Sequence, residues 1–202
     1  MKITNNIEEL ISDLNNGKVI CFKTDTIWGL SANPYNRIAV KHLYKIKQRV
    51  LNKPFIFLIK KGENIENFIT PPHLEERKII NKLWPGPISI IFNYNNQSDL
   101  LQFYTEQKTI ALRMPKNKLC QNILNKLDYP LPSTSVNIEG KEPINNFRDI
   151  IKFLKDEDVT ILKNINKTNN FISSTLIKIE NNKINVIRKG NLSKKILDYL
   201  KI

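Results

Sequence analysis

The chain has 202 residues, 41% of them hydrophobic, which is enough for one sizeable core and excludes a disordered protein. Its 32 Lys and Arg residues against 19 Asp and Glu give a net charge of +13, which suits a polyanionic partner such as a nucleoside triphosphate or RNA. The abundance of Asn, Ile and Lys throughout the chain also fits an AT-rich genome, so the charge by itself does not indicate RNA binding. We find no signal peptide and no apolar run long enough to span a bilayer, and we expect a cytoplasmic protein whose Cys21 and Cys120 stay reduced.

The N-terminal residues predict an amphipathic helix, because apolar residues recur at the spacing of one helix face. These residues are Ile7, Leu10, Ile11 and Leu14. Asn5 with Glu8 resembles a capping box, and Gly17 suits the end of the helix. The apolar run Val19–Phe22 then predicts a buried strand.

The segment Lys23–Leu30 places two hydroxyls, a carboxylate and a glycine after that strand. Ligands of open α/β sheets bind beyond the carboxyl ends of strands, so we expect a binding loop here. A helix follows, with Ala39, Leu43, Ile46 and Val50 on its apolar face. Lys47 and Arg49 lie off that face, near the end of the helix. They belong either to the ligand site or to a frayed helix end, where cations complement the helix dipole.

The rest of the chain alternates strands with helices. The predicted strands are Phe55–Ile59, Ile88–Phe92, Thr109–Met114, the extended segment Pro130–Asn137, and a hairpin of Ile172–Ile179 with Ile184–Arg188. The predicted helices are Leu74–Leu83, one containing Leu119, Ile123, Leu124 and Leu127, one containing Phe147, Ile150, Ile151 and Leu154, and a short last helix capped by Ser193. Trp84–Pro87 is expected to be a rigid turn and Asn93–Thr105 a polar loop. This order predicts a single α/β domain over residues 1–202 with a mixed sheet.

The polar residues favour a site that positions its reactants. The two histidines, His42 and His73, flank no metal-ligand pattern and are interpreted as solvated surface residues, and no Gly-rich phosphate loop is present. Basic and hydroxyl groups gather instead at the expected strand ends: Thr24, Thr26, Lys47, Arg49, Lys53, Arg113, Ser133, Ser135, Asn137, Ser174 and Arg188. Such groups suit phosphoryl or nucleotidyl transfer, although serines like Ser133 and Ser135 more often cap loops. Arg113, inside an apolar strand, needs a carboxylate partner from the protein or from a ligand.

In sequence order these residues resemble the motifs of the YrdC-type threonylcarbamoyl-AMP synthases, in their short form. The matching segments are Lys23–Leu30, Lys47–Arg49, Trp84–Pro87, Arg113–Pro115, Ser135–Asn137, Ser174–Thr175 and Arg188–Gly190. The resemblance covers nearly the whole chain. It departs from the family pattern at Lys23, where proline is usual, at Ser31, at Val136, and at Glu139, where serine is usual.

The resemblance implies a YrdC-like twisted mixed sheet flanked by helices, with a basic concave face. It implies a nucleotidyltransferase that makes L-threonylcarbamoyl-AMP and pyrophosphate from L-threonine, bicarbonate and ATP. The product would serve the modification of adenosine 37 in tRNAs reading ANN codons, through a downstream threonylcarbamoyl-transferase complex and with tRNA itself as a possible partner.

Carried over by position, the resemblance assigns the site residues. Thr26, Arg113, Ser133 and Ser174 would bind L-threonine. Arg49, Lys53, Thr109, Ser135, Pro143 and Arg188 would bind ATP. Lys47, Arg49, Ser135 and Asn137 would form the catalytic group. No metal ligand is expected among the side chains, and Mg²⁺ would be held mainly by the ATP phosphates.

Two alternatives stay open. The first is a non-catalytic module on the same fold that binds tRNA or double-stranded RNA through the basic face. The second is a carbamoyl-transfer domain of related fold, which the lack of attached partner domains disfavours.

Overall fold

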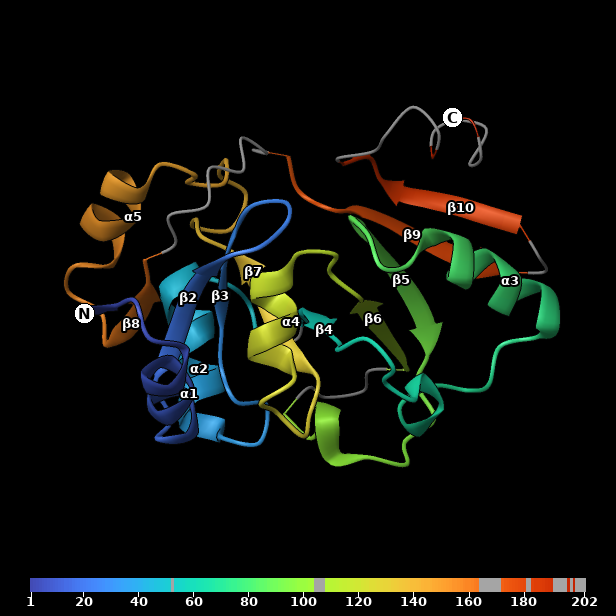
Figure 1. Cartoon of the computed structure of the whole chain (residues 1–202), viewed down its shortest axis with the longest axis horizontal. Helices are drawn as coiled ribbons and strands as arrows, with labels where there is room; N and C mark the ends of the chain where they lie inside the picture. Colours follow the sequence, from blue (N-terminus) through green and yellow to red (C-terminus); the bar gives the residue numbers. More distant parts are fainter. Residues whose placement is uncertain are drawn as a thin grey trace.

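The computed structural model describes residues 1–51, 53–103, 108–163, 172–180 and 183–190, together with Ile196 and Asp198, and these residues form a mixed α/β fold (Figure 1). The helices are α1 (Ile7–Asn15), α2 (Arg37–Lys47), α3 (Leu74–Leu83), α4 (Lys118–Leu124) and α5 (Phe147–Leu154), with short 3-10 helices η1 (Ile65–Asn67) and η2 (Asp99–Leu101). The strands are β1 (Lys2–Thr4), β2 (Val19–Lys23), β3 (Trp28–Ser31), β4 (Ile56–Leu58), β5 (Ile88–Asn93), β6 (Thr109–Arg113), β7 (Leu131–Ser135), β8 (Val159–Leu162), β9 (Thr175–Glu180) and β10 (Lys183–Arg188).

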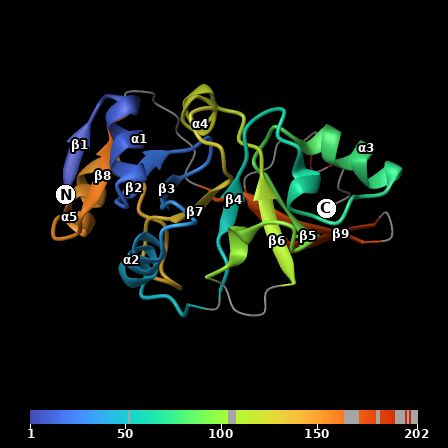
Figure 2. The ribbon, with the colours of Figure 1, turned by 90° about the horizontal axis from the view of Figure 1, so that it is seen from below.

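The described strands form a ten-stranded sheet in the order β1-β8-β2-β3-β7-β4-β6-β5-β9-β10. Four neighbouring pairs, β1–β8, β2–β8, β4–β6 and β5–β9, run parallel, and the other pairs run antiparallel. Seen from below, α1 and α4 lie over one side of the strands and α2 over the other (Figure 2). The prediction of a mixed sheet flanked by helices is confirmed, and so is the pairing of the late hairpin, β9 with β10.

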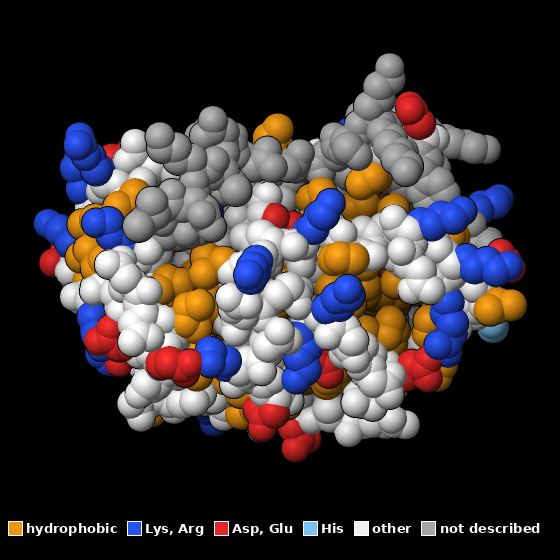
Figure 3. All heavy atoms as spheres, in the orientation of Figure 1, with side chains coloured by type: hydrophobic (Ala, Val, Ile, Leu, Met, Phe, Trp, Pro, Cys, Tyr) orange, Lys and Arg blue, Asp and Glu red, His pale blue; other side chains and the backbone are white. Residues whose placement is uncertain are grey.

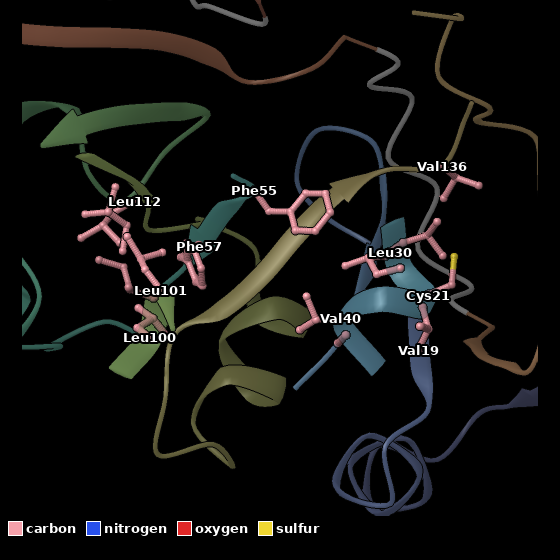
Figure 4. Packing of buried hydrophobic residues seen from close by; sticks show 14 of the residues in the cluster. Val19, Cys21, Leu30, Val40, Phe55, Phe57, Leu100, Leu101, Leu112 and Val136 are labelled. Atoms are coloured by element: carbon pink, nitrogen blue, oxygen red, sulfur yellow. The ribbon is translucent and has the colours of Figure 1, made fainter. Parts of the chain in front are cut away.

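Strand β2 shows how the sheet is buried on both faces. Val19 and Cys21 pack in a large core cluster with residues of α2, whereas Ile20 and Phe22 pack in a second cluster with residues of α1 and α4. Successive strand residues point to opposite faces, so each face buries its own half of the strand. Figure 4 shows Val19 and Cys21 beside α2 residue Val40. The uninterrupted apolar run of β2 is the pattern expected of a strand covered on both sides.

Much of the predicted binding loop is a strand. Only residues 24–27 form a tight turn, closed by a 3.1 Å hydrogen bond from the Thr24 amide to the Ile27 carbonyl. The chain then continues as β3, which is fully buried between β2 and β7. Gly29 and Ser31 give β3 a weak strand pattern, and the strand is held by neighbours on both sides. The sequence pattern does not predict β1 or β8 either.

Helix bounds differ in detail from the predictions. The N-cap of α1 is Asn6, not Asn5, and its side chain accepts a 2.8 Å hydrogen bond from the amide of Glu8. Helix α2 ends at Lys47, because Gln48 adopts a left-handed conformation, so Val50 lies outside the helix and is 63% exposed. Helix α3 has the predicted bounds.

Two predictions of exposed polar character are wrong. The segment 93–103 is not simply a polar loop, because η2 buries Leu100 and Leu101 in the core. His42 is half-buried and its Nε2 lies 2.8 Å from the Glu157 carboxylate. His73 is exposed as predicted. Ser193, predicted to cap a last helix, lies outside the described residues.

Candidate active site

The strand ends and the end of α2 surround a cavity of about 380 Å³. Ten of the predicted site residues line it: Thr26, Lys47, Arg49, Thr109, Arg113, Ser133, Ser135, Asn137, Ser174 and Arg188. Lys53 and Pro143 do not line it. Strands β3, β4, β6 and β7 are neighbours in the sheet, which brings together residues that lie far apart in the sequence.

Arg113 is a buried cation of the cavity, with a side chain only 5% exposed. Its Nη2 pairs with the Asp25 carboxylate, its Nη1 donates to the Thr26 hydroxyl at 3.0 Å, and its Nε donates to the Gly86 carbonyl at 3.3 Å. The buried guanidinium therefore has the carboxylate partner that its burial requires, and that partner belongs to the protein. Two of its five N–H groups are not engaged by these three contacts.

The turn of residues 24–27 places the hydroxyls beside Arg113. The Thr24 hydroxyl donates to the Ile27 carbonyl at 2.7 Å and lies 3.0 Å from the Thr26 hydroxyl. Asp25 is absent from the cavity lining, and it also accepts a 3.2 Å hydrogen bond from the Lys116 amide. Asp25 thus holds Arg113 from behind the cavity wall. We call Thr24, Asp25, Thr26 and Arg113, with the Gly86 carbonyl, the Arg113 cluster.

Two glycines allow the backbone to pack closely in the cavity wall around Arg113 and Ser174. A Cβ at Gly86 would lie 2.7 Å from the Leu83 carbonyl, so the turn Trp84–Pro87 needs glycine to bring its carbonyl to Arg113. A Cβ at Gly190 would lie 2.3 Å from the Ser173 carbonyl, so glycine lets the chain just after β10 pass close to the segment that carries Ser174.

Arg188 and Ser174 form a separate part of the wall. Arg188 Nη2 donates to the Ser174 carbonyl at 2.9 Å, and the Ser174 hydroxyl lies 2.9 Å from that of Ser89. Burial, followed by the nearby charge of Arg113, lowers the pKa of Arg188. Two close guanidinium groups in one wall create a positive potential that favours an anionic ligand.

Lys47 is the last residue of α2 and is only 2% exposed, so this end of the helix is buried and not frayed. Its Nζ donates to the Ser135 carbonyl at 2.8 Å and to the Asn137 side-chain oxygen. The Asn137 amide in turn donates to the carbonyls of Ile138 and Lys141, at 2.9 and 2.6 Å. Burial, with a smaller contribution from the charge of Arg49, lowers the pKa of Lys47 to about 8. The charge on this ammonium is therefore sensitive to pH near neutrality.

Arg49 sits at the rim beside Lys47. Its guanidinium lies 5.0 Å above the Phe55 ring, and its Nη2 donates to the Pro54 carbonyl at 2.9 Å. Glu139 lies 3.0 Å from Lys53 Nζ and 4.0 Å from Arg49 Nε. Lys53 therefore contacts the site indirectly, through Glu139. We call Lys47, Arg49, Lys53, Ser135, Asn137 and Glu139 the Lys47 cluster.

The predicted basic face is concentrated inside the cavity. Of the residues that the structure describes, four Lys and Arg side chains line it, against the single carboxylate of Glu139. On the outer surface, Lys and Arg side chains are spread over the face shown in Figure 3 rather than gathered in one patch. Lys47 and Arg113 are buried and Arg49 is half-buried, so salt screens their charges poorly. Arg188 is exposed.

The sequence analysis assigns no site role to two carboxylates that shape the site. Asp25 pairs with Arg113, and Glu139 pairs with Lys53. A signal existed for Asp25, because a buried arginine demands a carboxylate and this one precedes Thr26 in a matched motif. No sequence signal places Glu139 against Arg49 and Lys53, because its partners come from a loop some 90 residues earlier in the chain.

Comparison with known proteins agrees with this arrangement. A family model covering Sua5, YciO and YrdC proteins, described as "Telomere recombination", matches residues 12–190. The chain belongs to the Sua5/YciO/YrdC family. A putative threonylcarbamoyl-AMP synthase of Methanocaldococcus jannaschii is 36% identical over 186 residues, covering 91% of this chain and 85% of the relative. The threonylcarbamoyl-AMP synthase of Vibrio campbellii is 28% identical, covering 78% of this chain and 86% of the relative.

The fold of this family member is also found in a solved structure. Sua5 of P. abyssi, crystallised with L-threonine, superposes with a TM-score of 0.82 at 23% identity. The match covers 96% of this chain and 56% of the Sua5 chain, so the present chain spans little more than half of that protein. At this identity the likeness establishes the fold.

The described residues include no helix long and apolar enough to cross a membrane. Within the same residues, no group of three or more His, Cys, Asp or Glu side chains is placed to hold a metal ion.

Proposed function

We propose that this chain is an L-threonylcarbamoyl-AMP synthase, which joins L-threonine, bicarbonate and ATP and releases pyrophosphate. The observation that carries the proposal is that side chains of both clusters, Arg113 and Lys47 among them, line one cavity. One cluster offers hydroxyls beside a buried guanidinium, which suits a small hydroxy amino acid. The other offers cations and an amide, which suit phosphates. The names of the homologous synthases support the same reaction.

In the proposed complex, L-threonine lies against Thr26, Arg113, Ser133 and Ser174. The two N–H groups of Arg113 that its protein contacts leave available would receive the amino-acid carboxylate. Asp25 stays bound behind the guanidinium and fixes its plane. The hydroxyls would orient the substrate side chain and amine.

ATP is proposed to lie against Arg49, Ser135, Arg188 and Thr109, with Lys47 and Asn137 completing the catalytic group. Lys53 and Pro143, outside the lining, would contact ATP only at the rim. The threonine amine attacks the carbon of bicarbonate and water leaves, giving a carbamate. A carbamate oxygen then attacks the α-phosphorus, and pyrophosphate leaves with the electrons of the broken P–O bond. The side chains position the reactants and offset the growing negative charge on the phosphates.

Mg²⁺ is proposed to accompany ATP. The described part of the cavity lining contains one carboxylate, Glu139, which already pairs with Lys53. This lining fits an ion held by phosphate oxygens and water rather than by side chains. Mg²⁺ bound in this way would withdraw charge from the phosphates.

The proposed product is a reactive mixed anhydride, which must pass to a threonylcarbamoyl-transferase that modifies adenosine 37 of tRNAs reading ANN codons. We place this reaction in the cytoplasm. The two buried, unlinked cysteines are consistent with a reducing compartment.

Purified protein tests the proposal directly. Pyrophosphate should be released only when ATP, L-threonine and bicarbonate are all present, and labelled bicarbonate should enter an adenylate that mass spectrometry can identify. Pyrophosphate release that does not depend on threonine, or no release at all, would contradict the assignment.

A further inference from the structure

Among the described residues, Glu139 is the one acidic residue in the cavity lining, and its backbone is held in place. Its amide donates to the Lys47 carbonyl at 2.8 Å, which ties its loop to the end of α2. Asn137 also binds this loop, through the carbonyls of Ile138 and Lys141. The Glu139 carboxylate therefore extends from a hydrogen-bonded backbone toward Arg49 and Lys53.

The Glu139 carboxylate takes the place that a ligand anion would need. It accepts a 3.0 Å hydrogen bond from Lys53 and lies 4.0 Å from Arg49 Nε. The hydrogen bond from Lys53 is the largest cause of a lowered pKa at Glu139, followed among the lowering causes by the charges of Arg49, Lys53 and Lys47. The carboxylate is consequently ionised at neutral pH and partly neutralises the cations around it.

Arg49 shows that this neutralisation is incomplete. Its Nε is buried, yet it has no hydrogen-bond partner among the described residues. At 4.0 Å Glu139 makes a charge contact with this Nε but no hydrogen bond. The Phe55 ring and the Pro54 carbonyl hold the guanidinium in place. A buried donor without an acceptor is unfavourable, so a closer anion would be bound well here.

The contacts of Glu139 are easily exchanged. The Lys53 side chain is 60% exposed, and ion pairs at such exposed positions are weak. A phosphate oxygen can approach Arg49 Nε and Lys53 together, and it carries more charge than a carboxylate. Glu139 would have to move aside, because the two anions would otherwise repel each other.

We propose that Glu139 is a built-in competitor that sets the affinity of this site for polyphosphate. Its carboxylate serves as a resident counter-ion for Arg49 and Lys53, and a polyphosphate must displace it. The inference rests on the proposed function for its ligand class, nucleoside triphosphate and pyrophosphate. Its consequence is that inorganic pyrophosphate, which lacks the contacts of a nucleoside, binds weakly and leaves readily after the reaction.

Calorimetry with inorganic pyrophosphate on the full chain tests the inference. Glu139→Gln keeps the shape and removes the charge, and it should lower the dissociation constant of pyrophosphate by about three- to tenfold. Glu142→Gln changes the net charge equally at an exposed position of the same loop, and it should change this constant by less than about twofold. Glu139→Ser should tighten binding in the same direction, and thermal unfolding of each variant checks that the fold is kept.

Three results would overturn the inference. The first is unchanged or weaker pyrophosphate binding in both Glu139 variants when they are folded. The second is equal tightening by Glu142→Gln, which would show an effect of net charge alone. The third is weaker binding of adenosine in Glu139→Gln without tighter pyrophosphate binding, which would assign the carboxylate to the ribose hydroxyls. These binding measurements do not need catalysis, so failure of threonine-dependent pyrophosphate release would test the proposed function separately.

Discussion

The Arg113 cluster and the Lys47 cluster face the same cavity, but they are built differently. Arg113 stands at the end of a central strand, and each of its three nitrogens contacts a protein acceptor. Arg49 and Lys53 lie beyond the end of a helix, where one buried nitrogen lacks a hydrogen bond among the described residues and a half-exposed carboxylate is the counter-ion.

This difference separates two ways of binding an anion. The Arg113 cluster is fixed before the ligand arrives, so it loses little conformational freedom on binding and can select by shape. The Lys47 cluster exchanges one anion for another, so its affinity depends on a competition within the protein. A site that must hold an amino acid tightly enough to orient it, yet release a polyphosphate product, benefits from having both.

Replacing Arg113 should have the largest effect. Arg113→Ala removes the proposed carboxylate contact and leaves the half-buried Asp25 without its guanidinium. Threonine binding should become undetectable, and unfolding should require about 3 kcal/mol less. Calorimetry and urea denaturation measure the two effects. Arg113→Lys keeps the charge and should still lose at least about tenfold in threonine affinity, because the planar fork is gone. Threonine affinity close to that of the native protein in Arg113→Lys would contradict the assignment.

Lys47 should give the next largest effect, and it should depend on pH. The pKa of about 8 leaves the ammonium charged below that pH and neutral above it, so ATP affinity should fall as the pH rises through 8. Lys47→Met should weaken ATP binding by about tenfold at pH 7 and remove this pH dependence. Titration of an ATP analogue between about pH 6.5 and about pH 9.5 measures both effects, because this range spans the charged and neutral forms of Lys47. A native titration that stays flat over this range would contradict a charged contact between Lys47 and ATP.

Gly29→Ala should weaken only the binding of threonine, and by a smaller factor than the changes at Arg113 and Lys47. The added Cβ would lie 2.8 Å from the Ser133 hydroxyl, which must then turn away from its present position. We expect the KM for threonine to rise about fivefold while the KM for ATP stays within about twofold. Ser133→Ala is the matched control, since it removes the same hydroxyl without adding volume. If Gly29→Ala raised both KM values equally, the two clusters would not act independently.

Tyr44→Phe should have the smallest effect. The Tyr44 hydroxyl donates to the Lys53 carbonyl at 2.7 Å, and the Tyr44 ring packs on Phe55, which supports Arg49. Removing the hydroxyl should lower the free energy of unfolding by about 1 kcal/mol and raise the KM for ATP by about twofold. Threonine binding should be unchanged. An effect on threonine as large as that on ATP would show that the loop holding Arg49 also shapes the Arg113 cluster.

The sequence predicts most elements and most of the lining residues because their signals are local. The apolar spacing in α1 and α2 marks one buried helix face, and the apolar run of β2 marks a strand covered on both sides. Ordered motifs place hydroxyls and cations at strand ends, and ten of the predicted site residues do line the cavity. The roles assigned to them stay predictions until ligand binding is measured.

Only the tertiary structure decides the features that depend on neighbours distant in the chain. Strand β3 forms because β2 and β7 lie on either side of it, although Gly29 and Ser31 weaken its own pattern. Lys47 is buried because β7 and the loop after it supply acceptors for its ammonium. Glu139 becomes the counter-ion of Lys53 because folding closes a separation of 86 residues. Periodicity in a sequence reports which face of an element is apolar, whereas the partner of a charge is set by where the folded backbone brings the two groups together.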